Sequence, residues 1–214
     1  MNPLPDLDVS ALVPEAAAWR LISLLLECPA DPWAGEVAGL AKEVEDSLLQ
    51  QAAATALKTA TVAQYHTIFG PGGPAPPREV SYRETIQPGP FLADLRAMYA
   101  AFAYTPLIDE TPDHVAVETG FVSYLCLKAA YAQSLGDSDR AAATMDAARH
   151  FIAEHISVMT RPFATCLEQS GVAYLRDAAA ALLSRAGSQP QTKPFTLPIA
   201  DTDDCDTAGD FVGA

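Results

Sequence analysis

Apolar positions recur every three or four residues along most of the chain, and this spacing predicts helices. A first helix is expected to start at Pro14 and to stop at Pro29, and a second opens at Pro32. An alanine-rich stretch over residues 52–63 carries the same pattern on to Phe69. The first third of the chain is therefore predicted to be helical, with turns marked by the prolines.

The second half of the chain has the same spacing. An apolar stripe that begins at Phe91 is ended by Pro106, and Thr111 with Pro112 marks the capped start of the next helix. No alternating run of β-branched residues indicates a strand. We therefore predict an all-α fold of six or seven helices, the later ones over residues 90–105, 112–135, 138–159 and 160–185. Gly171 is a candidate break within the last of these, and Gly187 is its expected C-cap.

Two segments depart from the helical pattern. Residues 70–90 are rich in proline and glycine, which excludes a continuous helix, and a loop of this length in a compact domain is usually functional or disordered. From Ser188 onward, prolines are followed by aspartates, which predicts a flexible acidic tail. The expected organisation is one helical domain over residues 1–187 and a tail over 188–214, in which Phe195, Leu197 and Ile199 could dock on the body.

The charge of the chain limits the classes of partner that it is expected to bind. The 214 residues carry 13 Lys and Arg against 27 Asp and Glu, a formal net charge of −14, which disfavours nucleic acid and anionic membranes and suits basic partners or simple solubility. The leucine-rich segment at residues 21–26 is too short to cross a bilayer, and the first 14 residues lack a basic signal region. Four scattered cysteines fit a reducing compartment, so we expect a cytoplasmic protein without stable membrane insertion.

Signals for catalysis are weak. The pairs His114/Glu118 and His150/Glu154 are spaced to offer two metal ligands from one helix, yet such pairs are common on helix surfaces and the chain has no Glu-x-x-His motif. The Gly70–Pro74 run is not followed by Lys-Ser/Thr, and Gly-x-Ser-x-Gly is absent. We expect no catalytic residue, metal or cofactor; a helical metal-dependent enzyme is the alternative that metal analysis would reveal.

A binding surface remains. Tyr65, Ile68 and Phe69 form a patch at i, i+3 and i+4 just before the loop, a pattern that taken alone is typical of a core. The loop then carries Glu79 and Tyr82. Beyond it, a helix start brings together polar side chains, with an acid at its positive end and a histidine one turn before a glutamate: Asp113, His114 and Glu118. This combination indicates binding rather than chemistry.

Four segments resemble a known family. They are Tyr-His-Thr-Ile-Phe-Gly at 65–70, Pro-Pro-Arg-Glu-Val-Ser-Tyr at 76–82, Glu-Thr-Pro-Asp-His-Val-Ala-Val-Glu at 110–118 and Phe-Ile-Ala-Glu-His-Ile at 151–156. In this order they are similar to the motifs of the TorD/DmsD/NarJ-like cytosolic chaperones of molybdenum oxidoreductases. The chain departs from the family pattern at Gly120 and Met159, where larger side chains are common, and at Gly72-Gly73.

The resemblance implies an all-helical protein that is not an enzyme. It would bind the N-terminal region of an apo catalytic subunit, commonly a twin-arginine leader, and hold that subunit until its molybdenum cofactor is inserted. The same resemblance implies that the chaperone is a monomer or a homodimer. The alternative interpretation is a helical protein-interaction adaptor unrelated to metalloenzymes.

The resemblance also assigns roles to individual residues. The apolar side of the site would come from Tyr65, Ile68 and Phe69, and its polar side from Pro112, Asp113 and His114, with Glu118 and His155 behind them. Asp113 would meet a guanidinium group or shape the helix start, and titration of His114 near neutral pH would modulate binding.

Overall fold

The computed structural model describes residues 8–84 and 86–189, and these ranges contain helices and no strand. The prediction of an all-α fold is confirmed. Nine α-helical segments, one 3₁₀ turn and one π turn follow each other as α1 (Val9–Leu25), α2 (Trp33–Leu40), α3 (Ser47–Thr59), α4 (Val62–Phe69), η1 (Glu79–Tyr82), α5 (Pro88–Ala101), α6 (Val115–Ser134), α7 (Ser138–Phe151), η2 (Ile152–Ile156), α8 (Ser157–Gln169) and α9 (Ala173–Ala186). The predicted tail lies outside the described residues beyond Gln189, as do Phe195, Leu197 and Ile199.

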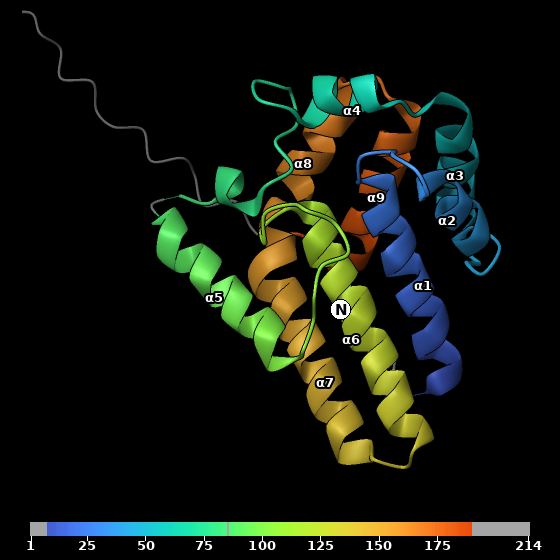
Figure 1. Ribbon diagram of the computed structural model, residues 1–214, viewed down its shortest axis with the longest axis vertical. Helices are drawn as coiled ribbons and strands as arrows, with labels where there is room; N and C mark the ends of the chain where they lie inside the picture. The colour runs from blue at the N-terminus through green and yellow to red at the C-terminus, as the bar shows by residue number, and fades with distance from the viewer. Residues whose placement is uncertain (1–7, 85, 190–214) are drawn as a thin grey trace, which may run out of the picture.

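The centre of the fold is the antiparallel pair of α1 and α6, which run side by side in Figure 1. Two buried serines join them from opposite directions. Ser23 Oγ donates to the Ala116 carbonyl at 2.8 Å, and Ser123 Oγ donates to the Ala16 carbonyl, also at 2.8 Å. Because serine and alanine are small, the two backbones can approach closely, and α6 is buried over most of its length.

The other helices cover this pair. α7 packs against α6, and α9 packs against α8 and α3. α4 lies beside the C-terminal part of α8 (Figure 1). α5 is an outer helix held by Leu95 and Tyr99, and the ring of Tyr99 contacts Phe121 with centroids 4.8 Å apart. The α5–α6 connection, residues 102–114, then crosses the face of α6.

Several predicted helix boundaries were wrong, and each has a local cause. α1 begins at Val9 instead of Pro14, because the Asp8 side chain accepts a hydrogen bond from Ser10 N and caps the helix five residues earlier than expected. The helical pattern to Phe69 is interrupted after Thr59, where Thr61 Oγ1 accepts from Gln64 N and caps α4. The break between α3 and α4 adds one helix to the number expected.

The predicted stop near Met159 does not occur. α7, η2 and α8 form one continuous helix with Pro162 inside it. One residue before the Val158 carbonyl, which loses its usual donor to this proline, the Ser157 carbonyl accepts hydrogen bonds from Thr160 Oγ1 at 3.2 Å and from Gln189 N at 3.1 Å. The predicted C-cap at Gly187 is confirmed, with a positive φ of 69°.

Candidate binding site

The two central motifs, residues 76–82 and 110–118, lie against each other. Glu79 N donates to the Asp113 carbonyl at 2.8 Å, and Val115 N donates to the Pro77 carbonyl at 2.8 Å. Arg78 and His114 therefore form an isolated antiparallel β-bridge. The loop that interrupts the helical pattern is thus attached by its backbone to the start of α6.

Asp113 strengthens this attachment from inside the protein. Its carboxylate is fully buried and accepts from Arg78 Nε at 3.0 and 3.2 Å and from Val80 N at 3.4 Å. Contrary to prediction, Pro112 and Asp113 precede α6 instead of occupying its first two positions. The Pro112 carbonyl accepts from the Tyr99 hydroxyl at 2.7 Å, so this turn is also tied to α5.

His114, not Thr111, is the N-cap of α6. Its Nδ1 accepts from Ala116 N at 3.1 Å, which leaves the proton on Nε2, 3.2 Å from the Tyr65 hydroxyl. Tyr65 in turn donates to Glu110 Oε1 at 3.4 Å. Burial lowers the pKa of His114 to about 4, so the imidazole is neutral at pH 7. The prediction that His114 titrates near neutral pH was therefore wrong.

Two buried carboxyl groups lie behind this turn, those of Glu79 and Glu118. Burial alone would raise the pKa of Glu79, but the hydrogen bond with His155, the proximity of Glu118 and the charge of Arg83 lower it. Burial and the adjacent Glu79 charge raise the pKa of Glu118 well above its ordinary value. The pair therefore holds one negative charge, on Glu79, which His155 Nδ1 contacts at 3.1 Å.

A pocket of about 480 Å³ opens in front of the attached loop. We call it the motif pocket; it is lined by Tyr65, His66, Phe69, Gly70–Gly73, Pro76–Arg78, Ser81, Glu110, Thr111 and His114. The rings of Tyr65 and Phe69 are 5.1 Å apart, and Phe69 stacks on Phe163 at 6.1 Å. The pocket therefore has an aromatic wall and one exposed carboxylate, that of Glu110.

Two glycines allow the loop that follows α4 to pass close to the backbone of that helix. A Cβ on Gly70 would lie 2.3 Å from the His66 carbonyl oxygen, and one on Gly73 would lie 2.4 Å from that of Ile68. Both obstacles are backbone atoms of α4, which cannot move aside independently. The Tyr82 hydroxyl donates to the Pro76 carbonyl at 2.7 Å and holds the loop from the other side.

The structure divides the sequence-predicted residues into three groups. Tyr65, Phe69 and His114 line the motif pocket, and Ile68 belongs to the hydrophobic core. The other predicted residues lie behind the pocket, and we call them the supporting layer because they hold loop 76–82 and the start of α6 in place. They are Glu79, Tyr82, Pro112, Asp113, Glu118 and His155.

Sequence reasoning missed the roles of Arg78, Arg83 and Glu110. Both arginines lie within the proline-rich loop and pair with a buried acid, Arg83 with Glu79 and Arg78 with Asp113. The spacing of Glu79 and Arg83 was an available signal, whereas the pairing of Arg78 with the distant Asp113 had none.

Within ranges 8–84 and 86–189, no group of three or more His, Cys, Asp or Glu side chains is arranged to hold a metal ion. In the same ranges, none of the helices has the length and apolar character needed to cross a membrane.

Comparison with known proteins gives one result for the family. A family model described as nitrate reductase delta subunit matches residues 31–165, which extend from α2 into α8 and include all four motifs. No curated protein matches the chain in sequence.

Proposed function

The chain belongs to the nitrate reductase delta subunit family, and on this premise we propose that it binds the N-terminal leader region of an apo molybdoenzyme catalytic subunit. The family consists of chaperones for the maturation of nitrate reductase-type molybdoenzymes, and its members are not catalysts. In our proposal the encounter takes place in the cytoplasm. The chaperone keeps the subunit available for insertion of the molybdenum cofactor before export or assembly. The alternative of an adaptor unrelated to metalloenzymes is set aside because of this membership.

The observation that carries the proposal is the motif pocket with its supporting layer. Loop 76–82 and the start of α6 are fixed by two backbone hydrogen bonds and by the ion pair of Arg78 with the buried Asp113 carboxylate. The pocket that they frame is mostly apolar and open to solvent. A rigid apolar pocket with few polar groups is the usual form of a recognition site.

The chemistry of the pocket suits a basic and apolar peptide. Aromatic and proline side chains, those of Tyr65, Phe69 and Pro76, would bury apolar groups and supply most of the affinity. Glu110 is exposed and would receive a guanidinium group through charge-assisted hydrogen bonds. We assign this contact to Glu110 and not to Asp113, because Arg78 already covers the Asp113 carboxylate.

The test is calorimetry of the full chain with a synthetic twin-arginine leader peptide from a nitrate reductase-type catalytic subunit. We expect Glu110→Arg to weaken binding at least tenfold, since the substitution replaces an attraction by a repulsion at the pocket rim. Glu168→Arg makes the same charge change at an exposed position of α8 outside the motif pocket and should alter binding less than twofold.

Two results would contradict the proposal. One is the absence of leader binding by the wild-type chain together with failure to co-purify the catalytic subunit. The other is an equal effect of the two charge reversals, which would reduce the role of Glu110 to general electrostatic attraction.

A further inference from the structure

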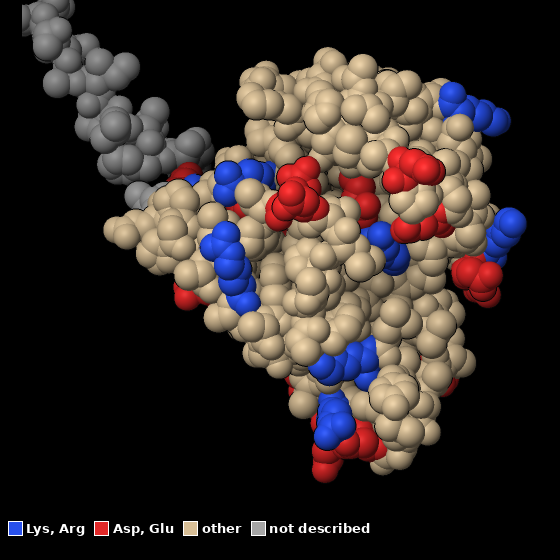
Figure 2. Space-filling model, in the orientation of Figure 1, with Lys and Arg blue, Asp and Glu red and all other residues tan. Residues whose placement is uncertain are grey.

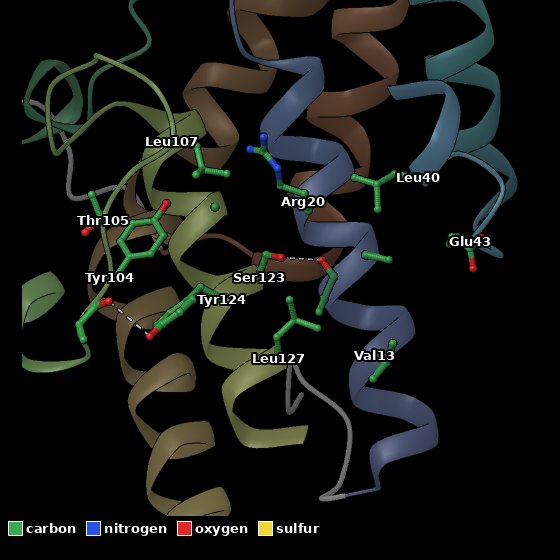
Figure 3. A pocket seen from close by; sticks show the side chains of 14 residues that line it. Val13, Arg20, Leu40, Glu43, Tyr104, Thr105, Leu107, Ser123, Tyr124 and Leu127 are labelled. Atoms are coloured by element: carbon green, nitrogen blue, oxygen red, sulfur yellow. Dashed lines mark hydrogen bonds between the residues drawn. The ribbon is translucent and has the colours of Figure 1, made fainter. Parts of the chain in front are cut away.

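A second and larger hollow lies between α1 and α6. It has a volume of about 700 Å³, and we call it the α1–α6 groove. Figure 3 shows Tyr104 and Leu107 of the α5–α6 connection on one side, Val13 and Arg20 of α1 on the other, and Leu127 of α6 between them. Its lining is predominantly apolar, and its volume is within the range of about 300–1,000 Å³ that is typical of ligand sites.

The apolar side chains of this groove are exposed to solvent. Val13 is 46% exposed, Leu127 49% and Leu107 80%. Exposed apolar side chains that border one hollow are more informative than the same residues scattered singly over a surface. These side chains have no covering element among the described residues.

The shape of the groove depends on a glycine. A Cβ on Gly120 would lie 2.8 Å from the Tyr104 hydroxyl oxygen, which donates to the Val117 carbonyl at 3.2 Å. The Tyr124 hydroxyl donates to the Phe102 carbonyl at 2.9 Å and fixes the start of the same connection to α6. The base of the α5–α6 connection is therefore anchored, and Leu107 projects from it beside the groove.

An acidic pocket of about 360 Å³ adjoins one end of the groove, and Arg20 and Leu107 line both hollows. It contains the carboxylates of Glu27, Asp31 and Glu36, of which Glu27 and Glu36 share the single arginine. Figure 2 shows acidic side chains gathered around a basic one on this part of the surface. The pocket can therefore accept a further cation.

The α5–α6 connection also joins these hollows to the motif pocket. Leu107 lines the groove and the acidic pocket, Ile108 lines the acidic pocket, and Glu110 lines the motif pocket. Three residues within a span of four, Leu107, Ile108 and Glu110, thus border three hollows.

We infer that the leader of the proposed client extends from the motif pocket across the acidic pocket into the α1–α6 groove, where its apolar segment binds as a helix. This inference rests on the proposed function. The partner chemistry is a polypeptide with basic residues at one end and an apolar helical face at the other, which is a known mode of helix-in-groove recognition.

The dimensions agree with such a partner. Val13 and Glu27 are 14 residues apart, although Glu27 lies just beyond the end of α1, so their separation along the helix axis is about 20 Å at 1.5 Å per residue. A bound helix of about 14 residues would therefore place a basic end at the carboxylates and its apolar face between Val13 and Leu127.

Charge complementarity favours this occupant over a second copy of the chain. A second copy carries the same formal charge of −14 and the same carboxylates, so two copies would repel each other at the acidic pocket. A peptide that carries basic residues would instead be attracted to it.

The experiment compares two synthetic peptides on the full chain by calorimetry. One is the complete leader, and the other ends after its basic residues. Leu127→Glu places a charge in the groove at a half-exposed position, so the fold should be retained, which circular dichroism checks. Leu135→Glu is the matched control, because Leu135 is 64% exposed at the end of the same helix and does not line the groove.

We expect the wild-type chain to bind the complete leader at least tenfold more tightly than the short peptide. Leu127→Glu should remove this difference by weakening the complete leader at least tenfold, the effect of losing about one leucine-sized apolar contact, and should leave the short peptide unchanged. Leu135→Glu should alter neither affinity by more than twofold.

The possible contrary results separate the two proposals. If the complete leader binds the wild-type chain and Leu127→Glu equally well, the groove is not its site, and the proposed function still stands. A wild-type dimer that Leu127→Glu converts to a monomer would assign the groove to a second copy and overturn the inference. If neither peptide binds the wild-type chain, the proposed function fails and the inference fails with it.

Discussion

Glu118 is expected to lower the stability of the folded protein at neutral pH. It is fully buried beside the charged Glu79, and its pKa is raised well above 4.5 by burial and by this neighbour. The folded protein must therefore keep a proton on Glu118 that the unfolded chain releases. By linkage, the stability of the native state decreases as the pH rises above 4.5 towards the folded-state pKa.

The size of this effect follows from the pH difference. Between the ordinary pKa of 4.5 and pH 7 there are 2.5 units, and at about 1.4 kcal/mol per unit the retained proton costs up to about 3 kcal/mol. Glutamine has nearly the same shape as a protonated glutamate, is neutral at every pH and also has a donor to offer Glu79. Glu118→Gln should therefore raise the free energy of unfolding by up to about 3 kcal/mol at pH 7, and by about 1 kcal/mol at pH 5.5.

The comparison variant is Glu79→Gln, which removes the charge that Arg83 and His155 contact. Removing one partner of a buried charged hydrogen bond should lower the free energy of unfolding by about 2–3 kcal/mol at pH 7. Urea denaturation followed by circular dichroism at pH 5.5, 6.3 and 7.0 measures both variants. If Glu118→Gln destabilises the protein, or if its effect does not change with pH, then the proton is not held as we describe.

Three further predictions concern stability and use the same urea assay. Unfolded histidine takes up a proton as the pH falls through 6.5, whereas folded His114 does so only near pH 4, so His114 alone should lower the stability by about 1.4 kcal/mol by pH 5.5, against the opposite contribution of Glu118. His114→Asn keeps a capping side chain and should become more stable relative to the wild type by about that amount at pH 5.5, and a difference between variant and wild type that does not change with pH would contradict the assignment. Gly73→Ala introduces a Cβ 2.4 Å from a carbonyl oxygen of α4 and should cost about 1–3 kcal/mol, whereas no loss would mean that the loop can move away. Ser23→Ala and Ser123→Ala each remove one hydrogen bond between α1 and α6, so each should cost about 1 kcal/mol and the double variant about 2 kcal/mol; a double variant that departs strongly from this sum would show that the two contacts are coupled.

The all-helical fold could be predicted from the sequence because its signals are local. Apolar spacing identifies helices, and the segment from Gly70 to Pro90 cannot continue one. The position of a helix start was harder to predict. Thr111-Pro112 has the form of a cap and first turn, yet α6 begins three residues later, because the His114 imidazole caps it while Asp113 is drawn towards Arg78.

The site was only partly predictable for a related reason. The motifs indicated which segments matter, but not which carboxylates face solvent. Asp113 is covered by Arg78 and Glu79 by Arg83, whereas Glu110 remains exposed at the pocket rim. These pairings depend on how the loop folds back on α6, and residue spacing does not encode that geometry. The α1–α6 groove was not predictable either, since it depends on how closely Tyr104 approaches Gly120.

The π turn between α7 and α8 makes chain length itself a determinant of the fold. The turn Ile152–Ile156 contains one residue more than α-helical winding would need, and both ends of the continuous helix bury their apolar sides, Phe151 before it and Phe163 after it. Deleting one residue here would return the turn to α-helical winding and leave the helices on either side in register. Deleting one residue from α7 instead would rotate everything that follows by about 100°. Phe163 would then leave Phe69 and Tyr82, and the aromatic stack behind the pocket wall would be lost.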